Sequence, residues 1–275
     1  MFIDKNCPFD PVHTFECGQC FRWNCGPDGI YVGVAEGRLC RVSGREIICE
    51  DKDFDFWSNY FSFDTDYNKI CNTLISKDEG LKKCIEFGNG IRILKQDVWE
   101  TIISFIISAN NNIPRIKRII ESLCLNFGER LTSNNIVYYS FPSPQRMAAL
   151  SKEDLAVLRV GYRDEYILDA ATKVAKKEID IAALHTMSDK DAKAELMKIK
   201  GVGGKVADCI MLFALGRFSV FPTDVWIKRI LTEVYGVSDK DIPTFVSQKY
   251  GDYAGFAQQY LYYYYRSQSD LKNGE

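Results

Sequence analysis

The sequence is poor in histidine, has no long apolar run and shows no excess of basic residues. His13 and His185 are the only histidines among 275 residues, so we find neither a convincing nucleophile triad nor a catalytic zinc set. No segment is long and apolar enough to cross a bilayer, and residues 1–11 lack the apolar core of a secretion signal. We therefore expect a protein that is not secreted, has no membrane contact and works in the cytoplasm.

Ten cysteines are present, but they are scattered through a long chain that is 46% hydrophobic. A chain of this size can bury a core without covalent staples, and no export signal precedes the cysteines, so we expect them to be reduced. None follows Cys209, which excludes an iron–sulfur cluster held by closely spaced cysteines near the C-terminus. We expect no cofactor.

The net charge of −2 argues against a general attraction to nucleic acid, because phosphate binding favours a basic surface. One segment, residues 191–231, is locally basic. It carries Lys193, Lys198, Lys200, Lys205, Arg217, Lys228 and Arg229 against Asp191, Glu195, Asp208 and Asp224. From charge alone, a solvated helix face explains this segment as well as a DNA contact does.

Two kinds of pattern divide the chain. The first third contains four short, partly alternating apolar runs separated by glycine-containing turns, and these predict an antiparallel sheet: residues 21–23, 30–34, 38–42 and 46–49. From about Asp53 the apolar spacing becomes helical, and after Gly90 it is helical almost throughout. The boundary near Lys95 predicts two domains: an N-terminal antiparallel β domain with flanking helices over residues 1–95, and a larger all-α domain over residues 96–275. The predicted fold class is therefore α+β.

Capping side chains mark several helix starts. Asp97 precedes a stretch, residues 102–107, that is apolar on all sides and must be buried. Ser151 and Ser188 are each followed by an aspartate three positions later, a pattern typical of helix N-termini.

The stretch from Leu196 to Leu215 contains two helical patterns joined by a glycine-rich turn. Gly201 and Gly203 let the backbone approach a partner closely, and the NH groups that open the second helix can bind an anion such as a DNA phosphate. Glycine between two helices is commonly only a tight turn, so this alternative stays open when the turn is considered alone.

Lys205 opens the second helix of this hairpin. After a return loop, Asp224 follows Pro222 and stands at the cap position of the next apolar-periodic helix. The amine and the carboxylate could therefore face one cleft. Outside this context, a solvated lysine and a capping aspartate are ordinary features.

The complete pattern resembles the helix-hairpin-helix superfamily of DNA glycosylases, and within it the 8-oxoguanine DNA glycosylase/AP lyases. Five matches in the right order carry the resemblance across roughly residues 15–265: Gly18 to Trp23, Ser108 to Arg115, Gly161 to Arg163, the glycine hairpin, and Tyr253 to Gln258. The resemblance implies an N-terminal sheet of the TATA-binding-protein type and a monomer acting on double-stranded DNA that contains oxidised guanine. In a prokaryote the protein would be associated with the nucleoid.

By this resemblance, the enzyme flips a nucleotide out of the duplex and holds its base in a pocket. Lys205 is the nucleophile that attacks the anomeric carbon and forms a Schiff base, and Asp224 stabilises the cationic sugar. Burial and the positive helix N-terminus both favour a neutral Lys205 amine. Elimination then nicks the strand on the 3′ side of the lesion.

The resemblance also assigns the other site residues. The carbonyl of Gly18 accepts the hydrogen that oxidised guanine carries at N7, and Cys209, paired as a thiolate with the Lys205 ammonium, packs against the base. The base pocket comprises Gly18, Cys209, Phe213, Pro222, Gln258 and Tyr262. Contacts to DNA and to the orphaned cytosine come from Asn110, Arg115, Tyr162, Arg163, Gly201, Gly203 and Val206, which predicts a preference for lesions opposite cytosine.

Two positions depart from the family pattern. Trp226 and Tyr265 stand where animal members carry histidine and aspartate, so a local phosphate contact and the network that sets the pKa values of the site are altered here. The cysteine-rich segment 13–25 leaves a redox or metal alternative, although its spacing fits no common zinc pattern. A noncatalytic DNA-binding module is the rival from another class, and the presence of Lys205 and Asp224 argues against it.

Overall fold

A computed structural model describes residues 2–273 of the chain. Its N-terminal part contains a four-stranded antiparallel sheet in the order β1-β2-β3-β4, which confirms the predicted sheet. The strands are β1 (Trp23–Cys25), β2 (Tyr31–Ala35), β3 (Arg38–Ser43) and β4 (Glu46–Ile48). The first strand begins two residues later than predicted. Phe21 instead packs edge-on against Phe105 of the helical part, with ring centroids 5.8 Å apart.

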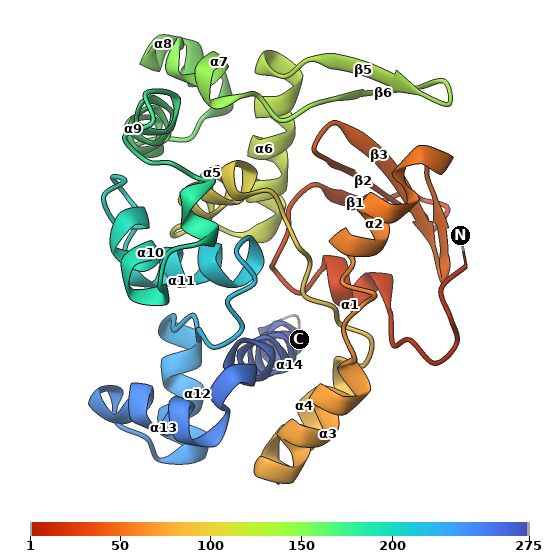
Figure 1. The fold of residues 1–275 in the computed structure, drawn as a ribbon, viewed down its shortest axis with the longest axis vertical. Helices are drawn as coiled ribbons and strands as arrows, with labels where there is room; N and C mark the ends of the chain where they lie inside the picture. Colours follow the sequence, from red (N-terminus) through yellow and green to blue (C-terminus); the bar gives the residue numbers. More distant parts are fainter. Residues whose placement is uncertain (1, 274–275) are drawn as a thin grey trace.

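Helices form most of the remaining structure, and the α+β class is confirmed (Figure 1). The α-helices are α1 (Pro11–Phe15), α2 (Phe54–Tyr60), α3 (Tyr67–Lys77), α4 (Lys82–Phe87), α5 (Val98–Ser108), α6 (Ile113–Phe127), α7 (Pro144–Ala148), α8 (Lys152–Leu155), α9 (Arg163–Ala175), α10 (Asp189–Leu196), α11 (Gly204–Phe213), α12 (Val225–Tyr235), α13 (Ile242–Lys249) and α14 (Ala254–Asn273). Short 3-10 turns are η1 (Asp51–Asp53), η2 (Glu79–Leu81), η3 (Ala156–Leu158), η4 (Ala183–His185), η5 (Asp239–Asp241) and η6 (Gly251–Tyr253). None of the helices in the described residues is both long and apolar enough to span a bilayer.

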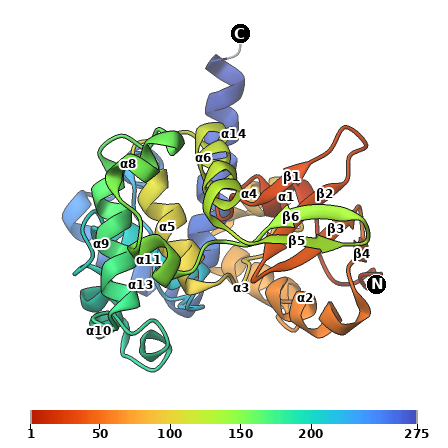
Figure 2. The same ribbon diagram turned by 90° about the horizontal axis from the view of Figure 1, so that it is seen from above.

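One hairpin was not predicted. Strands β5 (Arg130–Ser133) and β6 (Ile136–Tyr139) pair antiparallel within the region expected to be wholly helical. Their two-residue turn is formed by Asn134 and Asn135, whose φ angles of 49° and 62° fit the turn that joins tightly twisted strands. In Figure 2 the hairpin extends from the helical part over the N-terminal sheet.

The predicted helix caps are present. The Asp97 side chain accepts a hydrogen bond from the Glu100 backbone NH at 2.7 Å, and α5 behind it is buried along almost its whole length. Ser151 and Ser188 cap α8 and α10 in the same way. These local signals fix where α5 lies, and α5 in turn packs against α6, α9 and α11 at the centre of the helical part.

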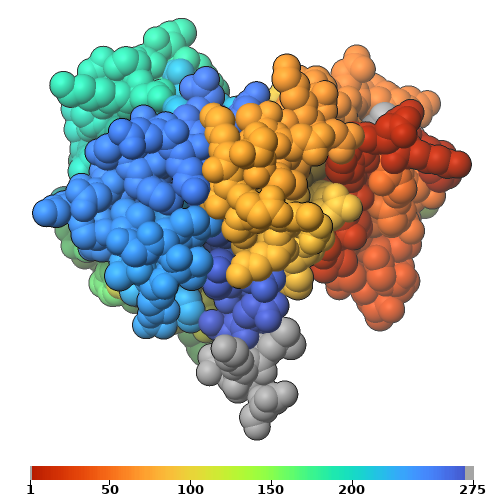
Figure 3. Space-filling view, turned by 90° about the horizontal axis from the view of Figure 1, so that it is seen from below, coloured from red at the N-terminus to blue at the C-terminus, as the bar shows by residue number. Residues whose placement is uncertain are grey.

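Two apolar cores stabilise the molecule. The smaller is rich in aromatic residues and lies around the N-terminal sheet, where Phe15 stacks on Trp23 at 4.0 Å. The larger core joins the helical part to buried residues of the N-terminal part, including Leu74 of α3 and Cys84 of α4. Figure 3 shows this orange segment lying directly against the blue C-terminal helices.

Candidate active site

The glycine hairpin forms as predicted, with α10 and α11 joined by residues 197–203. Gly201 has a φ of +81°, and a Cβ placed there would lie 2.4 Å from the Tyr166 ring, so a side chain is excluded. Gly203 is the N-cap of α11 and provides no side-chain cap, and a Cβ placed on it would meet nothing within 4 Å. The first NH groups of α11 therefore begin beside open space and suit an external anion.

The return loop brings the next helix back to the hairpin. Gly255, at the start of α14, donates its NH to the Phe218 carbonyl at 2.8 Å, and a Cβ there would collide with Leu212 of α11. At the end of the loop, Asp224 caps α12 by accepting a hydrogen bond from the Ile227 NH at 2.8 Å. This contact fixes the Asp224 carboxylate at the mouth of a cavity that it shares with Lys205.

That cavity collects the predicted catalytic pair and all the predicted pocket residues. Its lining consists of Cys17, Gly18, Phe105, Lys205, Cys209, Phe213, Pro222, Asp224, Gln258, Gln259 and Tyr262. Three lining residues were not predicted: Cys17, Phe105 and Gln259. Cys17 and Gln259 each adjoin a predicted pocket residue along the chain, whereas nothing in the apolar α5 pattern distinguishes Phe105 from its neighbours.

The cavity is small and partly open. Its volume is about 40 Å³, a few times the roughly 10–15 Å³ that a cavity needs to hold one water molecule. A wider hollow of about 450 Å³ adjoins it and shares Gly18, Phe105, Lys205, Asp224 and Tyr262 with its lining.

Lys205 is held as an ammonium ion in the free protein. Burial, the largest single influence, lowers its pKa, but the nearby Cys209, Asp224 and Tyr262 together raise the pKa above the usual value of 10.5. Burial thus acts in the predicted direction, but the balance of the surroundings favours the charged amine. The Lys205 Nζ also lies 5.5 Å from the centre of the Phe105 ring, a contact that favours the cation.

Cys209 contributes to this balance as a thiol. Burial raises the pKa of Cys209 to about 11, although the neighbouring Lys205 ammonium lowers it. Near neutral pH the pair is therefore an ammonium beside a neutral thiol, and the expected thiolate form is disfavoured.

Gly18 and Gln258 present polar groups to the cavity. Gly18 has a φ of +87°, and a Cβ placed on it would approach Tyr262 to 3.3 Å and Arg266 to 3.1 Å. The buried Oε1 of Gln258 has no hydrogen-bond partner within the described structure. A buried acceptor without a partner costs free energy, and a hydrogen-bond donor on an entering base would relieve that cost.

The residues predicted to contact the opposite strand lie at the outer hollow or beside it. Asn110 and Val206 line the hollow. Asn110 lies in the loop between α5 and α6 and has a φ of +50°. Arg115 donates to the Arg159 carbonyl at 3.1 Å. Arg163 is buried and donates to the backbone carbonyls of Ala109 and Asn110, so in the free protein it supports the loop that carries Asn110.

Three further aromatic residues singled out in the sequence lie in different places. Tyr162 is 53% exposed and meets Tyr166 edge-on at 5.7 Å. Trp226 lines the outer hollow, and the Arg229 guanidinium lies 5.3 Å above its ring. Tyr265 lies elsewhere on α14, near the Lys83 ammonium at 5.5 Å from its ring.

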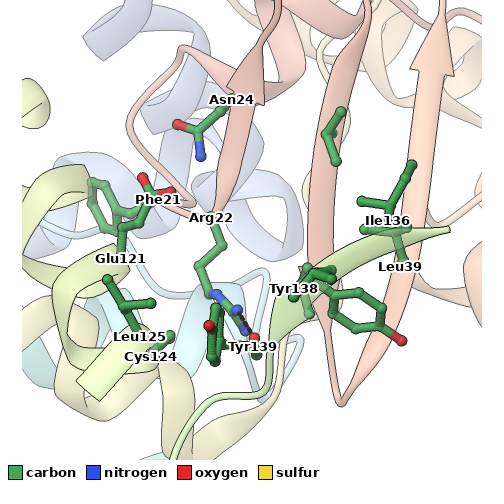
Figure 4. Close-up of a pocket in the computed structure, with 13 residues that line it drawn as sticks. Phe21, Arg22, Asn24, Leu39, Glu121, Cys124, Leu125, Ile136, Tyr138 and Tyr139 are labelled. Carbon is green, nitrogen blue, oxygen red and sulfur yellow. Dashed lines mark hydrogen bonds between the residues drawn. The ribbon is translucent and has the colours of Figure 1, made fainter. Parts of the chain in front are cut away.

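The metal alternative for segment 13–25 has no donor set in the part of the chain that the structure describes. No group of three or more His, Cys, Asp or Glu side chains there is close enough to hold a metal ion. A separate cavity of about 350 Å³ lies between the sheet and the β5–β6 hairpin, where Arg22 donates to the Tyr139 carbonyl at 2.5 Å (Figure 4). It contains none of the predicted site residues.

Comparison with known proteins decides the family. Residues 103–251 match the helix-hairpin-helix superfamily of base excision DNA repair proteins, and residues 2–102 match the N-terminal domain of 8-oxoguanine DNA glycosylases. The chain belongs to the 8-oxoguanine DNA glycosylase family. It is therefore an enzyme of the N-glycosylase and DNA lyase class. The junction between the two matches lies at 102/103, and the domain boundary predicted near residue 95 stays a prediction.

Relatives of this glycosylase family are known from sequence and structure. The N-glycosylase/DNA lyase of Saccharomyces cerevisiae is 36% identical over 242 residues, which are 74% of this chain and 64% of the yeast protein. The 8-oxoguanine glycosylase/lyase of Clostridium acetobutylicum, solved with double-stranded DNA containing cytosine opposite 8-oxoguanine, is 37% identical with a TM-score of 0.89 and covers 98% of both chains. The structure of MBOgg1 with a low-affinity DNA ligand is 43% identical, with a TM-score of 0.90 over 98% of this chain and 99% of that one.

Proposed function

We propose that this glycosylase flips 8-oxoguanine out of duplex DNA and excises it, preferentially opposite cytosine, through a Lys205 Schiff base. It then nicks the strand 3′ to the abasic site by β-elimination. The observation that carries the proposal is the shared cavity, which brings the Lys205 amine and the Asp224 carboxylate together with Gly18, Gln258 and Tyr262.

The chemistry begins with loss of a proton from the Lys205 ammonium, and this proton is finally carried away by the excised base. The amine lone pair attacks the anomeric carbon, the glycosidic bond breaks, and the base leaves with the bonding electrons. Asp224 is fixed by its own helix cap, and its carboxylate would stabilise the positive charge that develops on the sugar. Loss of the second amine proton to solvent and cleavage of the C1′–O4′ bond open the sugar ring, and the Schiff base formed in this way activates the sugar for elimination.

Recognition of the lesion depends on Gly18 and Gln258, which line the small cavity beside Lys205. The Gly18 carbonyl would accept the N7 hydrogen that 8-oxoguanine has and guanine lacks, and the unpartnered Gln258 Oε1 would accept from the Watson–Crick edge. A site that leaves a buried acceptor unpaired rejects the analogue that lacks the donor. The likeness to a structure solved with cytosine opposite 8-oxoguanine supports the choice of substrate.

Preference for the opposite base depends on the outer hollow. Asn110, Arg115 and Arg163 are the residues that would contact the orphaned cytosine, and Tyr162 is exposed where it could enter the base stack. We expect faster excision opposite cytosine than opposite the other three bases in single-turnover assays. Equal rates opposite all four would refute the preference and leave the glycosylase activity standing.

Borohydride trapping tests the mechanism. A duplex with one 8-oxoguanine opposite cytosine should give a covalent complex with the wild type, none with Lys205→Gln, and a normal amount with the control Lys95→Gln, whose ammonium pairs with Asp64 away from the cavity. A wild type that binds the lesion tightly but forms no complex would indicate a monofunctional glycosylase or a noncatalytic DNA-binding module.

A further inference from the structure

One face of α14 holds the chain segment that carries Gly18. Gln259, Tyr262 and Arg266 follow one another at helical spacing, so their side chains lie on the same side of the helix. Gln259 is buried and donates to the Cys17 carbonyl at 2.9 Å. Arg266, one turn beyond Tyr262, donates from Nη2 to the Glu16 carbonyl at 2.6 Å.

Arg266 contacts two parts of the base pocket: Gly18 on the N-terminal segment and Tyr262 on α14. Its guanidinium carbon lies 5.4 Å from the centre of the Tyr262 ring, and its Nη1 lies 3.1 Å from the point where a Cβ on Gly18 would be. A planar guanidinium can stack on a ring and donate in its own plane at the same time, which a lysine ammonium cannot do. Arg266 does not itself line the cavity.

One feature of Arg266 is not explained by a purely structural role. Its Nη1 is buried beside Gly18 and has no hydrogen-bond partner in the described structure. An arginine that served only to staple α14 to the N-terminal segment would be expected to use its buried donors, since an unmade charged hydrogen bond is costly. The guanidinium instead lies near the Tyr262 ring with this donor unpaired in the described structure.

We propose that Arg266 is a positioning residue for lesion recognition, which fixes the Gly18 carbonyl and the Tyr262 ring at the spacing that an extruded 8-oxoguanine needs. The inference rests on the proposed function and extends it. Recognition of a base requires both walls, whereas cleavage at a preformed abasic site requires only Lys205 and Asp224. Loss of Arg266 therefore affects the two reactions of the same enzyme differently.

The test compares Arg266→Met and Arg266→Lys with the wild type in two single-turnover reactions: excision of 8-oxoguanine opposite cytosine, and cleavage at an abasic site opposite cytosine. For Arg266→Met we expect excision to slow about tenfold or more, as loss of a charged hydrogen bond predicts, and abasic-site cleavage to stay within about twofold. Arg266→Lys should recover part of the excision rate, because it can still donate to the Glu16 carbonyl.

Arg38→Met is the matched control, because Arg38 also stacks on an aromatic ring, with its guanidinium carbon 4.2 Å from the Phe56 ring centre, but lies at the N-terminal sheet. It should leave both reactions unchanged. A double variant of Arg266→Met with Tyr262→Leu should slow excision by less than the product of the two single effects, because Arg266 acts through Tyr262.

Unchanged excision by Arg266→Met, or an equal loss in both reactions, would overturn the inference. If the wild type excises no 8-oxoguanine, the proposed function has failed instead. In that case a crystal structure of Arg266→Met decides the positional claim: displaced Gly18 and Tyr262 would support it, and unmoved walls would overturn it.

Discussion

The Lys205 amine is surrounded by groups that favour its charged form. Burial alone would lower its pKa, yet Cys209, Asp224 and Tyr262 shift the balance the other way, and Cys209 remains a thiol because burial raises its pKa to about 11. An ammonium has no lone pair with which to attack a sugar. The nucleophile is therefore protonated near neutral pH, and its deprotonation belongs to the reaction.

This protonation state predicts a pH dependence. Below the Lys205 pKa the neutral fraction of the amine rises about tenfold per pH unit, so borohydride trapping under single-turnover conditions should accelerate from pH 6 to pH 9. Cys209→Ala removes the sulfur that accepts a hydrogen bond from the Lys205 ammonium and thereby helps to raise the pKa of Lys205, so its profile should shift to lower pH. Cys124→Ala, a buried cysteine outside the catalytic cavity, is the control. If Cys209→Ala has the same pH profile as the wild type, the Cys209 thiol does not influence the pKa of the Lys205 amine.

The helix that carries Lys205 differs from its neighbours in its first turn. Side chains cap α5, α6, α10 and α12, whereas the N-cap of α11 is Gly203 and provides no side-chain hydrogen bond. A glycine at the N-cap costs a little stability, about 0.3 kcal/mol relative to a capping aspartate or asparagine. The open NH groups are useful if a DNA phosphate takes the place of the cap.

Gly203→Asp should therefore have opposite effects on stability and binding. The backbone of Gly203 is extended and its Cβ position is free, so the new carboxylate can cap α11 and should raise the free energy of unfolding by about 0.3 kcal/mol. The same carboxylate would occupy the phosphate position and repel DNA, and we expect at least a tenfold loss of affinity in a fluorescence titration. Gly203→Asn supplies a neutral cap, so it should stabilise the protein with a smaller loss of DNA affinity than Gly203→Asp causes. DNA affinity unchanged by Gly203→Asp would exclude this helix end as a phosphate site.

Local signals were enough to predict most elements but not all. The caps at Asp97, Ser151 and Ser188 depend on residues three positions apart, so the sequence shows them directly. The β5–β6 hairpin was missed because its strands have only four residues each, although Asn134-Asn135 between alternating residues was a usable turn signal.

Contacts between residues that lie far apart in the sequence could not be predicted from such local signals. The motif matches indicated which residues form the pocket, and the structure brings all of them to one cavity. The bonds from Gln259 to Cys17 and from Arg266 to Glu16 span 242 and 250 positions, and no periodicity or spacing reports them. The small size of the cavity likewise depends on residues from five separate segments.

The larger core crosses the predicted domain boundary. Helices α3 and α4 precede residue 95, yet their apolar residues belong to the core of the helical part. Asp78, which lies just after α3, is 6% exposed and accepts hydrogen bonds from the hydroxyls of Tyr235 and Tyr250, at 2.9 and 2.7 Å. Removal of this segment would leave two tyrosine hydroxyls without their partner and open a large apolar surface.

Fragments of the chain test where the folding boundary lies. A fragment of residues 96–275 loses several fully buried side chains, each worth about 1.5–3 kcal/mol, and this approaches the whole stability of an ordinary domain, about 5–15 kcal/mol. We expect it to lack a cooperative thermal transition by near-ultraviolet circular dichroism, whereas residues 64–275 should melt cooperatively. Residues 64–275 also keep Lys205 and Asp224 but lack Gly18, so they should cleave abasic sites and excise no base. A cooperative transition of 96–275 at the temperature of the full chain would instead place the folding boundary near residue 95.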